Sequence, residues 1–359
     1  MTDAAGRARA AIGLYGDPTA SWSIVLEADL SEPVDGDVVS GRLAVAAAAH
    51  PNLGVPPIAR PVPAGDWARV RSEFSDFSYG PDDPLVRVAV GVDVPKIVIA
   101  AHHGAVDGLG LLALLGIALD TPVRTEAAGV FGRPAKVSFV RSALTRLREA
   151  LFAPPTRVHP TGGGTDTATG DLLLAEHLPR RAFGTAKLAA SAAEATCSWN
   201  AEHGTPADRV VAGIGASRRA GAALVPDLSS TFFRLPLGTS TDEATVRALL
   251  ARAAPEPDFP RSASVVARKA IRALAGRLGS TFLASNLGVV HAGETVRALS
   301  FHPAASGRSG VAFGAVTVGD TTTVTLRARR RDFDEAAATE LLRRLLQASG
   351  VESESSRHG

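Results

Sequence analysis

The chain has 359 residues, of which 45% are hydrophobic and 21% charged, and its net charge is only +2. This is an ordinary globular composition, and the length suffices for two domains with sizeable cores. The arginines form no concentrated basic arm, which argues against nucleic acid as a partner. A single cysteine, Cys197, excludes an internal disulfide and favours an intracellular, cytoplasmic protein. No window approaches the roughly 18 to 20 apolar residues of a membrane span, and the N-terminus lacks the apolar core of a secretion signal.

The first third of the chain predicts strands and helices in alternation. The predicted strands cover residues 22–30, 84–91 and 96–101, and the predicted helices cover residues 37–50 and 109–119. The turn residues 92–95 join the last two strands as a hairpin. This hairpin delivers a short polar loop, residues 102–108, to the start of an apolar helix.

That loop holds His102, His103, Asp107 and Gly108, and three interpretations of it compete. In the first, the histidines belong to the core and Asp107 caps the helix. In the second, two histidines and a carboxylate bind a metal ion. Adjacent histidines on an extended backbone point to opposite faces, which disfavours convergence on one ion. In the third, one histidine is a general base and Asp107 keeps the loop rigid.

The residues from His102 to Gly108 match the HHxxxDG signature and resemble the coenzyme A-dependent acyltransferase superfamily. This superfamily is similar to chloramphenicol acetyltransferase and includes nonribosomal peptide condensation domains, wax ester synthases and polyketide-associated acyltransferases. The turn at residues 50–53 resembles the family's HPxLR segment, with Gly54 in place of the arginine. The resemblance implies that His103 is the catalyst, with His102, Asp107 and Gly108 around it. The Gly108 backbone N–H, at a helix start, is the local candidate for stabilising an oxyanion.

A linker rich in Gly, Pro and Thr, residues 156–170, separates the two halves of the chain, and we expect His159 within it to be solvated. The elements expected around it are helices over 140–152, 184–200, 241–252, 265–278 and 334–347, strands over 172–177, 210–219 and 230–237, a strand that breaks into a loop over 281–288, and a hairpin over 311–326.

The resemblance also suggests further site residues in the second half. Ser285 and Asn286 resemble a family motif that ends a strand, begins a latch across the first domain and lines the channel. Residues 227–230 replace a Gly-Asn pair that lines the donor side in the family, so the resemblance leaves donor contacts there open. Arg218 or Arg219 is a candidate partner for Asp107, against the alternative of exposed arginines at a strand end. The arginines of residues 327–331 are weaker candidates for contacting coenzyme A phosphates, because charge runs usually face solvent.

We therefore expect an α/β protein of two chloramphenicol acetyltransferase-like subdomains with a channel between them. The expected boundaries are 1–155 and 171–350, followed by a flexible tail at 351–359. The implied function is acyl transfer from an acyl-coenzyme A or an acyl carrier protein's phosphopantetheine thioester to a hydroxyl or amine, in secondary metabolism, without a permanently bound cofactor or metal. A condensation-domain-like amide- or ester-forming enzyme, or an inactive homologue that binds carrier proteins, remains the alternative.

Overall fold

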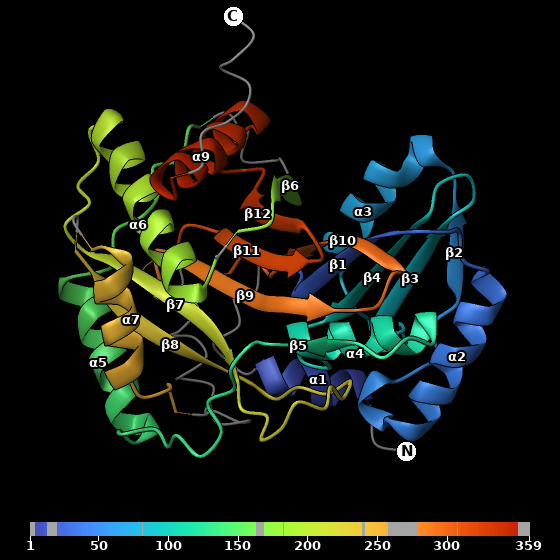
Figure 1. Cartoon of the computed structure of the whole chain (residues 1–359). Coiled ribbons are helices and arrows are strands. Elements are labelled where there is room, and N and C mark those ends of the chain that lie inside the picture. Colours follow the sequence, from blue (N-terminus) through green and yellow to red (C-terminus); the bar gives the residue numbers. More distant parts are fainter. Residues whose placement is uncertain are drawn as a thin grey trace, which may run out of the picture.

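The computed structural model describes residues 4–12, 20–80, 82–162, 169–181, 183–238, 241–257, 277, 279–306 and 308–350. The centre of the predicted linker, nearly all of the helix predicted over 265–278, and the tail over 351–359 lie outside the described residues. Two mixed sheets, each with helices beside it, lie next to each other, as Figure 1 shows. This architecture confirms the predicted α/β class with two subdomain-like halves.

The first sheet has the strand order β10-β1-β4-β3-β2. Its strands are β1 (Ser23–Leu30), β2 (Ala59–Val62), β3 (Val86–Gly91), β4 (Lys96–His102) and β10 (Val296–His302). Antiparallel pairing of β3 with β4 confirms the predicted hairpin. Alternate side chains of β1 and β4 enter two different cores, because successive residues of a strand face opposite sides. Helices α2 (Gly36–Ala49) and α4 (Gly108–Leu119) cover one face, and α3 (Trp67–Ser75) covers the other.

The second sheet has the order β6-β12-β11-β9-β7-β8, and β5 (Arg124–Thr125) pairs with β9 beside this path. Its strands are β6 (Asp171–Pro179), β7 (Val210–Ser217), β8 (Ser230–Leu237), β9 (Phe282–His291), β11 (Val311–Val318) and β12 (Thr321–Arg329). The main core lies between this sheet and the helices α6 (Thr185–Glu202) and α9 (Glu335–Ala348).

Among the remaining helices, one that precedes the predicted linker lies with the second half of the protein. Helix α1 (Ala4–Ile12) lies in the first half, and α7 (Glu243–Arg252) lies near β8 in the second. Helix α5 (Phe139–Phe152) packs beside α7 and β8, although it precedes the predicted linker, and Arg234 of β8 bonds its Glu149 at 2.6 Å. The boundaries at 155 and 171 stay a prediction.

The predicted linker is partly packed. Val158 is fully buried, and the His159 ring lies 2.8 Å from the Thr205 hydroxyl and stacks on His203. The expectation that His159 is only solvated is therefore wrong. The sequence signal came from flanking Pro and Gly residues, which mark irregular backbone but do not report what packs against it.

Strand β9 does not end near Ser285, as the sequence suggested, but continues to His291. Gly288 lies at φ +76° within it, and the register against β11 shifts next to this glycine, so the strand bends at a bulge instead of ending. After β9 the chain crosses into the first sheet, where β10 pairs antiparallel with β1. The latch that the resemblance implies is expected along this crossing.

Arg327 of β12 fastens the two halves together. Its guanidinium donates to the backbone carbonyls of Ser23 in β1 and Ser75 in α3, and forms an ion pair with Asp171 at 2.6 Å. The side chain is 1% exposed, so it cannot reach a coenzyme A phosphate at the surface. The suggestion that this arginine meets such a phosphate is therefore wrong.

We expect Arg327→Met to lower the free energy of unfolding by about 3–5 kcal/mol, because it leaves the Asp171 carboxylate without its buried partner. Urea unfolding measures this loss. The matched control is Arg331→Met, since the exposed Arg331 pairs, among the described residues, only with its neighbour Asp332 and should change stability by about 0.5 kcal/mol or less. Equal stabilities for both variants would show that Arg327 does not join the halves.

His302, the last residue of β10, is fully buried, and neither ring nitrogen has a hydrogen-bond partner among the described residues. Burial, with Arg71 and Arg327 nearby, holds its pKa well below the usual value. The folded protein therefore keeps this ring neutral, whereas the unfolded chain takes up a proton below about pH 6.5.

Stability should consequently fall as the pH drops below about 6.5, by about 1.4 kcal/mol per pH unit until the folded protein also binds the proton. Unfolding curves at pH 7.5 and 5.5 test this. His302→Leu should remove this component of the difference, while an unchanged difference in that variant would assign the pH dependence to other groups.

Candidate active site

The motif loop, residues 102–108, lies between the end of strand β4 and the start of helix α4. Strand β4 ends at His102, a tight turn follows, and α4 starts at Gly108. The backbone N–H groups of Ala105 and Val106 both donate to the His102 carbonyl, at 2.8 and 3.3 Å. Asp107 caps the helix, accepting the Gly110 N–H at 2.8 Å. The capping predicted by the simplest interpretation is therefore present, together with further contacts of the same carboxylate.

The two histidines point to different sides of the first sheet, as the strand periodicity predicted. His102 is 4% exposed and lies on the α3 side, where its ring meets Tyr79 edge-on at 5.1 Å. Its Nδ1 accepts the Gly104 N–H at 3.1 Å. His102 thus shapes the turn from inside the core.

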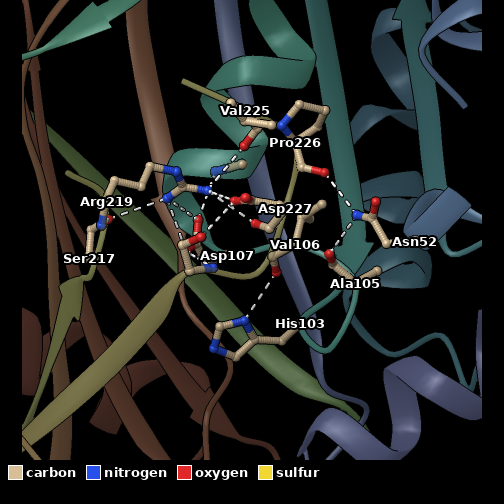
Figure 2. Close-up of polar contacts among 12 residues, drawn as sticks. Asn52, His103, Ala105, Val106, Asp107, Ser217, Arg219, Val225, Pro226 and Asp227 are labelled. Carbon is tan, nitrogen blue, oxygen red and sulfur yellow. Dashed lines mark hydrogen bonds and ion pairs between the residues drawn. The ribbon is translucent and has the colours of Figure 1, made fainter. Parts of the chain in front are cut away.

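His103 is part-buried, and its backbone N–H donates to the Trp22 carbonyl at 2.7 Å. Its Nδ1 lies 3.2 Å from the Val106 carbonyl oxygen. A carbonyl only accepts, so Nδ1 must donate in this contact, and in the neutral form of the ring Nε2 is then the unprotonated nitrogen. Figure 2 shows the ring held from this one side. A neutral imidazole with a directed Nε2 is the form that a general base requires.

Asp107 does not orient the imidazole directly. Its carboxylate forms a buried ion pair with Arg219, in which one guanidinium nitrogen lies 2.9 and 3.0 Å from the two oxygens. The two side chains are only 4% and 8% exposed. The Ser229 N–H donates to the same carboxylate at 3.0 Å. Of the two candidate arginines, Arg219 is the partner, whereas Arg218 bonds the Thr231 hydroxyl.

The loop over residues 225–229 is the part of the site that the sequence did not reveal. The Asp227 carbonyl accepts the Asp107 N–H at 3.2 Å, and its carboxylate pairs with Arg219. Arg219 also donates to the Val225 carbonyl at 3.0 Å. The sequence marked residues 227–230 only as a departure from the Gly-Asn pair of the family. The one available signal was an aspartate within ten residues of an arginine pair, which is too common to indicate a contact.

A side chain at Gly108 would displace its neighbours. A Cβ built on it would lie 2.8 Å from the Leu287 side chain and 2.9 Å from the Phe301 ring. Leu287 belongs to β9 and Phe301 to β10, so both strands pack against the start of α4. The first N–H groups of a helix have no partner within the helix and carry its positive dipole end.

Ser285 and Asn286 occupy opposite faces of β9. The Asn286 amide donates to the Phe183 carbonyl at 2.7 Å, and its oxygen accepts the Gly288 N–H at 2.7 Å. Asn286 thus supports the β9 bulge, and its role as a channel residue stays a prediction. Ser285 shares a face with Leu287, two residues on, and this face meets the motif helix.

Within the described residues, no group of three or more His, Cys, Asp or Glu side chains is arranged to hold a metal ion. The same part of the chain contains no helix with the length and apolarity needed to span a membrane.

No family model matches the chain, and no curated protein matches it. Solved structures do. The starter condensation domain of rhizomide synthetase in complex with C8-CoA and Leu-SNAC superposes with a TM-score of 0.63 at 14% identity, covering 97% of this chain and 93% of that one. The first condensation domain of the calcium-dependent antibiotic synthetase gives 0.64 at 15% identity, covering 97% and 94%.

The chain has the condensation-domain fold. A cyclization-docking bidomain from Sorangium cellulosum also matches, with a TM-score of 0.59 at 13% identity over 99% of this chain and 86% of that one. These alignments run over nearly the full length of the chain. This confirms the fold that the HHxxxDG resemblance implied.

Proposed function

We propose that this protein is an acyltransferase that moves an acyl group from a thioester to a hydroxyl or amine, with His103 as general base. The observation that carries the proposal is the 3.2 Å contact between His103 Nδ1 and the Val106 carbonyl, which leaves Nε2 as a proton acceptor. The fold shared with condensation domains supports this assignment.

The reaction needs no covalent enzyme intermediate. His103 Nε2 takes the proton of the acceptor O–H or N–H as that atom attacks the thioester carbonyl. The tetrahedral intermediate then collapses, the C–S bond breaks, and the imidazolium returns the proton to the departing thiolate. The products are an ester or amide and a free thiol, and the histidine is regenerated.

The oxyanion of the intermediate needs a fixed donor, which is worth about 3 kcal/mol in comparable enzymes. We assign this role to the Gly108 N–H, at the positive end of the α4 dipole. The tight packing of Gly108 against Leu287 and Phe301 fixes its position. His102 and Asp107 act as positioning residues for the turn.

The donor in this proposal is an acyl-coenzyme A or an acyl group on the phosphopantetheine arm of a carrier protein, and no permanently bound cofactor takes part. A condensation domain of the same fold was crystallised with C8-CoA and Leu-SNAC. Ser285, on the β9 face that meets the motif helix, is our candidate substrate contact in a channel between the two halves.

Mass spectrometry tests the proposal. Purified protein is incubated with acyl-coenzyme A or acyl-pantetheine donors and mixed alcohols and amines, and both the small molecules and the intact protein are weighed. We expect acylated acceptor and no acylated protein. Tight binding of a carrier protein or donor without any acylated acceptor would instead support the inactive carrier-binding homologue.

A further inference from the structure

Asn52 lies in the short 3-10 turn Pro51–Leu53, far from the motif in sequence, yet its side chain contacts the motif loop. Its Nδ2 donates to the Ala105 carbonyl at 3.0 Å and to the Pro226 carbonyl at 2.8 Å. Figure 2 shows the amide between these two segments, on the side of the loop away from Arg219. One nitrogen thus joins the motif turn to a loop that follows it by more than a hundred residues.

Only an amide suits this position. Both partners are carbonyl oxygens, which accept and never donate, and Nδ2 supplies two N–H donors from a single atom. An aspartate has the same shape but presents acceptors to both carbonyls. Asparagine and aspartate have the same size, so the contact depends on the two N–H groups of the amide and not on size.

The two bonds act on the catalytic geometry through one peptide unit. The Ala105 carbonyl and the Val106 N–H belong to the same planar peptide. Fixing this plane restricts the backbone of Val106, whose own carbonyl holds His103 Nδ1. The Val106 N–H bond to His102 is long, at 3.3 Å, so it alone fixes the plane weakly.

The loop over residues 225–229 is tied to the motif at other points as well. It accepts the Asp107 N–H at Asp227 and donates to the Asp107 carboxylate from Ser229. These bonds hold the C-terminal end of the motif turn, next to α4. Asn52 alone, among the contacts described, links this loop to the middle of the turn.

We propose that Asn52 is a positioning residue that registers the loop 225–229 against the motif turn and thereby orients the His103 ring. The claim rests on the function proposed above. His103 and Asn52 both belong to the first half of the protein, whereas the loop 225–229 belongs to the second. The orientation of the His103 ring would therefore depend on both halves.

The test compares Asn52→Asp, which keeps the shape and loses both donors, with Leu53→Val, which loosens the buried packing of the same turn and keeps the amide. Asn52→Ser, whose hydroxyl cannot reach both carbonyls, replaces the aspartate variant if that does not fold. Steady-state thiol release gives kcat and KM. Nitrogen-15 NMR of labelled histidine reports the ring tautomer, with the His103 signals assigned by their loss in His103→Gln.

We expect Asn52→Asp to lower kcat about ten- to hundredfold with the KM for the donor changed about twofold or less, because the base is misaligned while binding is retained. We also expect the His103 signals to lose the pure Nδ1–H pattern. Leu53→Val should change neither. Wild-type kcat and ring signals in folded Asn52→Asp would overturn the proposal, as would the same changes in Leu53→Val.

The NMR measurement needs no substrate. A tautomer change in Asn52→Asp, with no turnover even by the wild type, would support the positioning role and count against the acyltransferase proposal. An unchanged tautomer alongside normal turnover would do the reverse.

Discussion

Replacing His103 with alanine is expected to lower acceptor-dependent thiol release about 10²- to 10⁴-fold, the usual contribution of a general base. The loss should fall on kcat, because the imidazole acts on a proton in transit and is not needed to bind the donor. The fold should survive, since the ring is only part-buried and its one described side-chain bond is to the Val106 carbonyl. Thiol release and a thermal unfolding curve, measured on the same sample, check both expectations.

His177→Ala is the matched control. This histidine is exposed on β6, and its ring contacts the Thr323 hydroxyl at 3.0 Å, so its loss should leave the rate unchanged. A His103→Ala protein that retains more than about a tenth of the wild-type rate would refute the general-base role.

Arg219→Leu is expected to lower the free energy of unfolding by about 3–5 kcal/mol, because it leaves the buried Asp107 carboxylate without its counter-charge. The same change also removes the bonds from Arg219 to the Val225 and Asp227 carbonyls, so the loop 225–229 should be held less firmly against the motif turn. Activity should therefore fall even under conditions where the variant is fully folded. Urea unfolding and thiol release measure the two effects.

Arg218→Leu provides the comparison at the next residue. Arg218 bonds the Thr231 hydroxyl, whereas Arg219 holds the Asp107 carboxylate, so replacing Arg218 should keep that ion pair and leave activity intact. If the two variants were equally stable and equally active, the Arg219–Asp107 pair would have no special role in holding the site.

The sequence predicted the local elements well, because their signals are local. The apolar alternation in β1 and the Leu-rich run of α4 each report a period that a few residues establish. The strand periodicity also sent His102 and His103 to opposite faces. The motif therefore could be located, and its helix cap at Asp107 predicted, from a dozen residues.

Contacts between distant segments were beyond that reasoning. Arg218 and Arg219 are adjacent and chemically identical, and only the end of strand β7 decides which one reaches Asp107. Asp227 and Asn52 carry no local pattern that marks a partner in the motif turn. Such contacts depend on how the two halves meet, which no single window of sequence records.

The prediction that strand β9 ends near Ser285 was wrong for a different reason. The Ser-Asn-Leu-Gly sequence has turn composition, and in isolation it favours a loop. Strand β11 pairs with Ser285 and Asn286 and again from Val289, which keeps the backbone extended through the segment, and Gly288 absorbs the irregularity as a bulge. Tertiary pairing thus outweighed local preference, and Asn286 bonds backbone groups of Phe183 and Gly288.

The most direct test of the central claim is thiol release by the wild-type protein from an acyl-coenzyme A or acyl-pantetheine donor, with and without an acceptor. We predict that thiol release requires the acceptor and equals the amount of ester or amide formed, because the proton taken by His103 comes from that acceptor. Release at the same rate without any acceptor, or none with either class of donor, would contradict acyl transfer by this site.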